Sequence, residues 1–166
     1  MPSPASPRPW RHALHACDSV AAVFGSFAPL VLLWQGKKES RPLPAWKDFD
    51  FEAFAGWHDM MVLDAIDHEP FDALTLIWGS RLAEIAGYQP RGKRLSESIA
   101  MRGLLEEDFA FFRRVVGEPC IGIATGQLDW RGRDFITMSR IYLPCAPEGG
   151  VVDHVVSFCE IVSAPS

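Results

Sequence analysis

The segment from Phe71 to Gly92 constrains the fold of this chain most, because it predicts three successive elements without a break. Phe71–Trp78 is rich in aromatic and β-branched residues, as strands are. Ser80 can cap a short helix whose apolar positions share one face, and Gly87 can take the left-handed conformation that ends it. A strand that leads directly into a two-turn helix is typical of a structural scaffold rather than of a catalytic loop.

Four more strands are predicted around that segment. The second half of Trp57–Ile66 precedes it, and the short polar connection at 67–70 favours an antiparallel hairpin with Phe71–Trp78. A second helix is predicted from about Leu104 to Val116, with acidic residues early and arginines late, as the helix dipole favours. The last three strands, separated by turn signals, are Cys120–Trp130, Asp134–Leu143 and Val151–Val162.

The residues before the sheet are predicted to form an N-terminal helix. From Leu14 onward, apolar residues recur at alternating spacings of three and four, the helix should kink or restart at Pro29, and Gly36 can end it. The apolar stripe either packs on its own domain or meets a second copy of the chain. In the second case the candidate dimer or partner contacts are Leu14, Ala21, Phe24 and Val31.

These elements divide the chain into four parts. Residues 1–9 hold four prolines and are predicted to be a disordered tail. The helical segment spans 10–36, a proline-bearing linker spans 37–54, and the sheet domain spans 55–163. Although arginines precede the apolar run Val20–Trp34, the run is interrupted by Gly25 and Pro29 and no small-x-small cleavage site follows it. A secretory signal or membrane span is therefore not expected.

Charge and cysteine content exclude several classes of function. The net charge of -5 argues against sequence-independent nucleic-acid binding, which requires clustered Lys and Arg. The four cysteines lack CxxC spacing, so they predict neither a zinc site nor a redox pair. The simplest interpretation is a reduced, cytoplasmic protein without a bound metal, and nothing in the sequence assigns a cofactor.

Candidate ligand-binding residues lie on the last two strands. Strand alternation places Met138, Arg140 and Tyr142 on one face of the first and His154 and Phe158 on one face of the second. If both faces look inward, Arg140 can bind a carboxylate or phosphate, and Tyr142 and His154 can donate to it. Met138 and Phe158 then form an apolar wall. The alternative is that Arg140 and His154 lie on the solvent side or in a surface pair.

Five short motifs follow one another along the chain: Trp34, Leu43-Pro44, Trp78-Gly79-Ser80-Arg81, Arg91-Gly92 and Leu143-Pro144-Cys145. Taken in this order, they resemble a PAS-like family of small single-domain proteins from alphaproteobacteria. The family's strand arginine is Leu76 here, and its threonine before the second glycine is Arg91. The element order predicts an α+β fold, a curved five-stranded antiparallel sheet with short helices on one face and an N-terminal helix. The resemblance implies that this is a PAS fold with a sensory or regulatory role in signal transduction.

Three functions are compatible with these features. The first is a sensor that binds a small molecule or a protein partner and acts in trans, because only four residues follow the last strand and no output domain is expected. The second is a ligand-free interaction module for a scaffold or a dimer. The third is a small enzyme on a cone-shaped α+β fold, which would need an acid or base such as Asp59 or His154 inside a cavity. We expect the sensor and no catalytic residues.

Overall fold

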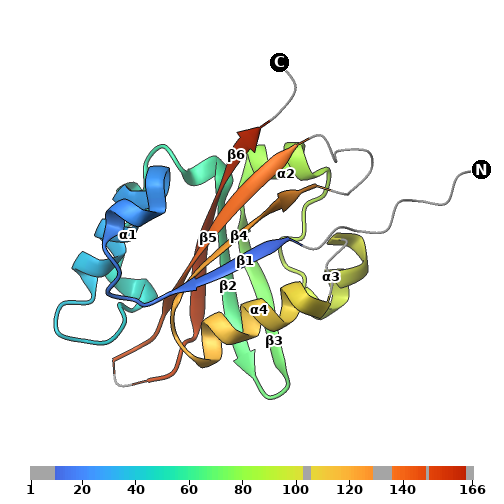
Figure 1. The fold of residues 1–166 in the computed structure, drawn as a ribbon. Helices are drawn as coiled ribbons and strands as arrows, with labels where there is room; N and C mark the ends of the chain where they lie inside the picture. The colour runs from blue at the N-terminus through green and yellow to red at the C-terminus, as the bar shows by residue number, and fades with distance from the viewer. Residues whose placement is uncertain (1–9, 103–105, 129–135, 149, 164–166) are drawn as a thin grey trace, which may run out of the picture.

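A computed structural model describes residues 10–102, 106–128, 136–148 and 150–163 of the chain. A twisted antiparallel sheet forms its centre, with strand order β1-β4-β5-β6-β2-β3 (Figure 1). The five predicted strands are all present, and β3 has the predicted bounds. The strands are β1 (Arg11–His15), β2 (Met61–His68), β3 (Phe71–Trp78), β4 (Ile121–Gln127), β5 (Thr137–Cys145) and β6 (His154–Ser163).

The sheet has a sixth strand, β1, where a helix that includes Leu14 was predicted. That prediction is wrong for residues 11–15. β1 lies at the sheet edge, antiparallel to β4, with Leu14 opposite Gly122. Next to it, the His12 ring stacks on Phe111 at a centroid distance of 4.4 Å, and its Nε2 lies 2.8 Å from Asp108 Oδ1. These partners are about a hundred residues away in the chain, so the helical spacing of the local apolar residues does not decide the conformation.

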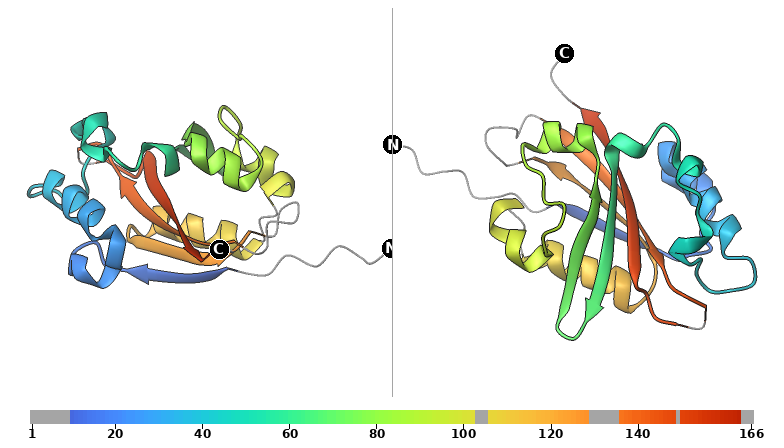
Figure 2. Two further views of the ribbon diagram at one scale, coloured as in Figure 1. Left: turned by 90° about the horizontal axis from the view of Figure 1, so that it is seen from above. Right: turned by 180° about the vertical axis from the view of Figure 1, so that it is seen from behind.

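The helices cover both faces of the sheet (Figure 2). The face that we call the helix face carries Tyr142 and Gly122 and packs against α4, while α2 packs against Met138 and Val62 on the same face. A single face was predicted for α2 and α4, and this is confirmed. The helices on this side are α2 (Ser80–Ala86), α3 (Leu95–Arg102) and α4 (Glu106–Gly117).

The N-terminal segment packs beside the opposite face, which carries Ile141 and Phe158. Its helix starts later than predicted. Pro29 lies in the first turn of α1 (Ala28–Lys37), where its missing N–H costs nothing, and Gly25, at φ 58°, interrupts the preceding 3-10 helix η1 (Ala21–Phe27). The predicted tail at residues 1–9 lies outside the described residues.

The stretch predicted as a linker, 37–54, packs into the core. Leu43 and Phe54 are buried, and the Ala146 amide donates to the Pro44 carbonyl at 2.9 Å. This stretch therefore belongs to the same packed unit as the sheet. It contains η2 (Trp46–Asp48) and η3 (Phe51–Phe54), and η4 (His58–Met60) follows just before β2.

Trp34 fixes α1 to the sheet, and its replacement by Phe is expected to destabilise the protein by about 1–3 kcal/mol. The indole is 1% exposed, and its Nε1 donates to the Pro144 carbonyl at 2.9 Å. Trp34→Phe removes this bond and leaves a small void. Urea unfolding gives the change in free energy, with Leu32→Ala on the exposed side of the same helix as the control. Equal stability of the two variants would contradict this account of α1.

Candidate functional site

A polar cluster lies within the helix face of the sheet, and four neighbouring strands each contribute one residue. We call it the Arg140 cluster; its members are Asp64 (β2), Thr75 (β3), Arg140 (β5) and Ser157 (β6). Arg140 Nε donates to Ser157 Oγ at 2.8 Å, and its Nη2 lies 3.4 Å from Asp64 Oδ2. Thr75 Oγ1 donates to Asp64 Oδ1 at 2.9 Å. Asp64, Thr75 and Ser157 are all at most 3% exposed.

Strand register explains why these residues meet. Tyr142 lies opposite Ser157 in the β5–β6 ladder, so Arg140, two residues earlier, shares the Ser157 face. Val62 lies opposite Ser157 in the β6–β2 ladder, which places Asp64 on that face, and the β2–β3 ladder sets Thr75 opposite Asp64. A guanidinium taken out of water needs an acceptor or a carboxylate nearby, and Asp64 and Ser157 supply both.

Arg140 keeps its positive charge in this position. Burial alone would lower the pKa of Arg140, but the nearby Tyr142, Cys159 and Asp64 groups outweigh this effect and raise it. Burial raises the pKa of Tyr142 to about 12 and that of Cys159 to about 11. Both groups are therefore protonated at neutral pH, and the Cys159 thiol is a poor nucleophile.

Among the described residues, one nitrogen of the Arg140 guanidinium has no hydrogen-bond partner. The Arg140 side chain is 14% exposed, and within the described residues its Nη1 forms no hydrogen bond. Its carbon Cζ lies over the Tyr142 ring at 4.4 Å from the centroid, a cation–π contact that holds the guanidinium plane. Ser157 and the Tyr142 ring thus hold Nη1 in a fixed position, where it has no acceptor among the described residues.

Aromatic and apolar side chains surround the cluster. The Tyr142 ring also contacts Phe111 at a centroid distance of 5.3 Å. Close approach of α4 requires Gly122, because a Cβ there would lie 2.7 Å from the Phe111 ring and the Val115 side chain. On the α2 side, Trp78 stacks on Tyr88, with 5.5 Å between centroids. This composition, a few placed polar groups in an apolar setting, is that of small-molecule sites.

The structure divides the five predicted ligand-binding residues between the two faces. Met138, Arg140 and Tyr142 share the helix face, and the alternative that Arg140 lies on the solvent side is wrong. His154 and Phe158 lie on the opposite face, because Arg140 pairs with Cys159 and so selects the other set of β6 side chains. Phe158 packs on Phe54 at 5.2 Å between centroids, and His154 Nδ1 lies 3.0 Å from Asp153 Oδ1.

The four predicted partner-contact residues are occupied within their own chain. Ala21, Phe24 and Val31 are between 0% and 8% exposed and belong to the core. Leu14 packs against the cluster of Phe111 and Val115. The apolar side chains that the N-terminal segment leaves exposed are instead Val20, Val23 and Leu32.

Asp64, Thr75 and Ser157 were not predicted as site residues, although the sequence holds a signal for one of them. Asp64 interrupts the apolar stretch Met61–Ile66. A carboxylate in a buried strand requires a cation or several donors, so Asp64 and Arg140 are natural partners. Thr75 and Ser157 carry no such signal, because hydroxyl side chains are common on either face of a strand.

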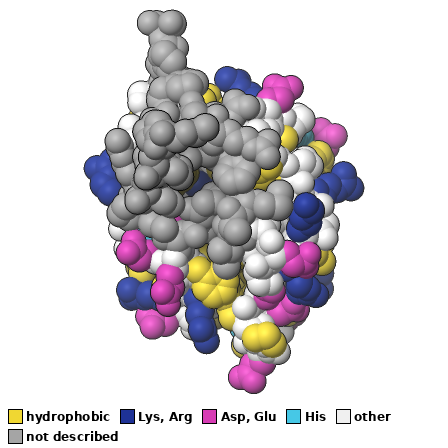
Figure 3. All heavy atoms as spheres, turned by 90° about the vertical axis from the view of Figure 1, so that its right-hand side faces the viewer, with side chains coloured by type: hydrophobic (Ala, Val, Ile, Leu, Met, Phe, Trp, Pro, Cys, Tyr) yellow, Lys and Arg dark blue, Asp and Glu magenta, His cyan; other side chains and the backbone are white. Residues whose placement is uncertain are grey.

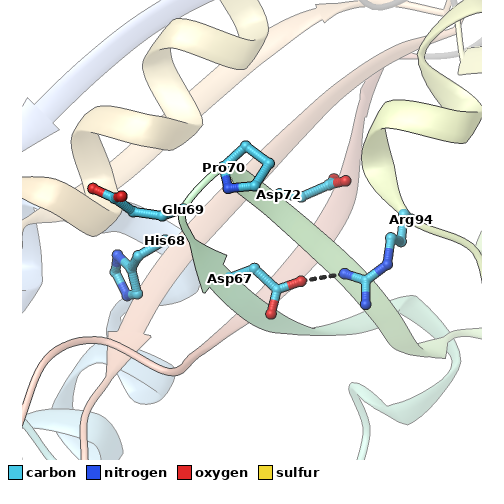
Figure 4. A pocket seen from close by; sticks show the side chains of 6 residues that line it. All are labelled: Asp67, His68, Glu69, Pro70, Asp72 and Arg94. Atoms are coloured by element: carbon cyan, nitrogen blue, oxygen red, sulfur yellow. Dashed lines mark hydrogen bonds and ion pairs between the residues drawn. The ribbon is translucent and has the colours of Figure 1, made fainter.

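A shallow pocket of about 360 Å³ lies at the β2–β3 turn (Figure 4). Asp67 pairs with Arg94 across it. Asp72 accepts hydrogen bonds from the Ser96 hydroxyl and amide, and these bonds connect β3 to the start of α3. Burial alone would raise the pKa of Asp72, but the hydrogen bonds outweigh it, so the pKa is lowered. His68 Nε2 lies 2.7 Å from the Val152 carbonyl. Each of these groups thus has a structural partner.

Charged side chains of both signs lie on the described surface. On the face shown in Figure 3, acidic and basic side chains of the described residues are interspersed, and no broad basic patch is visible among them. Among the described residues, no group of His, Cys, Asp and Glu side chains is arranged to hold a metal ion. In the same part of the chain, none of the helices has the length and apolar character needed to cross a bilayer.

Comparisons with known proteins establish the fold. No family model matches the sequence, and no curated protein matches it. Among solved structures, the chain is similar to an RNA-binding light-oxygen-voltage receptor, with a TM-score of 0.51 and 11% sequence identity. The match covers 94% of this chain but 40% of that structure. Together with the element order, it shows that this chain has a PAS-like fold, with a sixth strand, β1, added at one edge of the sheet.

Proposed function

We propose that this chain is a sensory or regulatory module that takes up a small molecule at the Arg140 cluster and passes the change to a protein partner. The observation that carries the proposal is a charged guanidinium inside the helix face whose Nη1 edge lacks a partner among the described residues. An apolar side chain of similar volume would stabilise a purely structural core at least as well. The arginine is better explained by a ligand that completes its hydrogen bonds.

β6 offers a route from the cluster to the surface. Ser157 and Glu160 lie three residues apart on this strand, and the Ser26 hydroxyl of η1 donates to the Glu160 carboxylate at 2.6 Å. A ligand that shifts the Arg140 guanidinium while its Nε stays bound to Ser157 would displace β6 as well. Since η1 is bonded to the same strand, the N-terminal segment is the element that would respond.

Two further features shape this proposal. The four cysteines are free thiols, which suits a reducing compartment such as the cytoplasm. RNA binding is named for the similar receptor and is not carried over to this chain, because a net charge of -5 disfavours contact with a phosphate backbone.

An enzyme is not proposed either, because Asp59 is exposed and His154 lies on the face away from the cluster.

Native mass spectrometry of protein purified without added ligand tests the proposal. We expect an extra mass that is lost on denaturation, that is absent from Arg140→Gln, and that remains in Arg41→Gln. Arg41 is a matched control because it also pairs with an aspartate, Asp48, at 2.5 Å, away from the helix face. A ligand retained by Arg140→Gln, or no bound mass together with no response to a metabolite library, would overturn the proposal.

The second candidate is a ligand-free interaction module. It is favoured by Val20, Val23 and Leu32, which are 70%, 64% and 61% exposed on the N-terminal segment. Isolated exposed apolar residues are ordinary, but three on one short segment suit a protein contact. If the protein is free of ligand and the change of these three residues to serine abolishes self-association or partner capture, this second function replaces the first.

A further inference from the structure

Resting on the function proposed above, we infer that the ligand of the Arg140 cluster is a monocarboxylate with an apolar or aromatic body. The first step is the orientation of the guanidinium. Its Nε is bound to Ser157 Oγ at 2.8 Å, and its plane lies over the Tyr142 ring. The outer edge of Arg140 is then formed by Nη1, which has no bond among the described residues, and by Nη2, which lies 3.4 Å from Asp64 Oδ2. We call this pair of nitrogens the open edge of Arg140.

The open edge matches a carboxylate. The Nη2–Asp64 Oδ2 distance of 3.4 Å is long for a charge-assisted bond, whose usual length is about 2.7–2.9 Å. Asp64 is also engaged by Thr75 through its other oxygen. Nη1 and Nη2 therefore offer two N–H groups in a plane, the geometry that binds both oxygens of one carboxylate. A neutral carbonyl would use one of these groups and would gain less from the charge.

The charge balance favours one negative charge over two. Around the guanidinium, Tyr142 and Cys159 are neutral at pH 7, so Arg140 and the Asp64 carboxylate are the charges of the cluster. A monocarboxylate adds one negative charge beside Asp64. A phosphate dianion would add two, and repulsion from Asp64 is strong where little water is present. A carboxylate is thus preferred to a phosphate at this site.

The surroundings of Arg140 select the body of the ligand. The Arg140 guanidinium lies over the Tyr142 ring. Three apolar side chains share the helix face with it, Met138, Trp78 and Phe111, and all are at most 8% exposed. No second cation is found near Arg140 among the described residues. A ligand with further charges, such as a dicarboxylate, would lack partners there, whereas an aliphatic or aromatic body would contact apolar groups.

Binding of matched probes tests this inference. Hexanoate, phenylacetate and indole-3-acetate are compared with their primary amides and with phenyl phosphate, by isothermal titration calorimetry on protein freed of any bound molecule. We expect at least one acid to bind about tenfold or more tightly than its amide and than phenyl phosphate, since about 1.4 kcal/mol corresponds to tenfold. Arg140→Gln should abolish this preference, and Arg140→Lys should reduce it because a lysine cannot bind both oxygens.

Controls separate this inference from the proposed function. Arg41→Gln should bind as the wild type does. If Arg140→Gln does not fold, as judged by circular dichroism, Ser157→Ala keeps the charge but loses the anchor of Nε and should weaken the acid more than its amide. Amides that bind as tightly as acids, phosphate preferred to carboxylate, or no binding by any acid would overturn the carboxylate assignment. The proposed function would still stand if a neutral molecule were released from the purified protein in an Arg140-dependent way.

Discussion

Replacing Asp64 with alanine should destabilise the protein by about 3–5 kcal/mol, because it leaves the Arg140 guanidinium without its carboxylate. The two side chains are 4% and 14% exposed, so solvent replaces little of the lost interaction. Thr75, which donates to the same carboxylate, would lose its acceptor as well. The loss is measured by urea unfolding followed through tryptophan fluorescence.

Asp67→Ala is the matched control for this effect. Asp67 also pairs with an arginine, Arg94, but their side chains are 53% and 43% exposed, and such pairs contribute about 0–1 kcal/mol. A similar small loss for Asp64→Ala and Asp67→Ala would show that the Arg140 cluster is hydrated and that its burial does not matter for stability.

A double replacement, Asp64→Leu with Arg140→Met, separates stability from function. Buried ion pairs replaced by apolar residues of similar volume often leave proteins equally stable or more stable. We expect the double variant to recover most of the stability lost in Asp64→Ala while binding no ligand. Such a result would mean that the pair is kept for binding, because the fold would be at least as stable without it.

The sequence predicted best where the signal is local. The bounds of Phe71–Trp78 agree with the structure, and α2 ends at Gly87, which has the expected left-handed φ of 82°. The predicted cap at Ser80 is wrong, because Ser80 is the first residue of α2, Gly79 takes the cap position and no side chain caps the helix. The signals for these features, a β-branched run and a glycine C-cap, lie within a few residues of the elements they specify. No distant partner was needed to predict them.

Prediction failed where a distant partner decides the conformation. Residues 11–15 are extended because they pair with β4 and because His12 contacts Phe111 and Asp108 of α4. The apolar spacing from Leu14 onward fits a helix equally well, and nothing within the segment indicates the neighbouring strand. The packing of Leu43 and Phe54 likewise depends on the far end of the chain, where Ala146 binds Pro44.

The candidate site was half predicted for a related reason. Alternation alone placed Met138, Arg140 and Tyr142 together, since they lie on one strand. It could not decide which β6 residues join them, because Val155 and Cys159 on one face are as apolar as Val156 and Phe158 on the other. A shift by one residue in register exchanges the two sets.

The second large effect is expected for Gly79→Ala, which should cost about 3 kcal/mol or more. Gly79 joins β3 to α2, and its amide donates to the Met61 carbonyl at 2.8 Å. A Cβ at this position would lie far inside van der Waals contact with the Asp59 carbonyl group and 2.8 Å from the Met60 amide nitrogen. All of these are backbone atoms, so no side chain can rotate away. η4 would have to separate from the end of β3.

Gly36→Ala is the control that isolates this steric effect. Gly36 lies inside α1, and a Cβ there would meet no atom within 4 Å. Because alanine favours helices over glycine, this variant should be more stable than the wild type by about 0.5–1 kcal/mol. Urea unfolding gives the change in stability for both variants. A loss for Gly79→Ala together with a gain for Gly36→Ala would show that the loss comes from the contact of the new Cβ with the Asp59 and Met60 backbone. If Gly79→Ala is tolerated, the close contact between η4 and the end of β3 is not what sets the position of α2 over the Arg140 cluster.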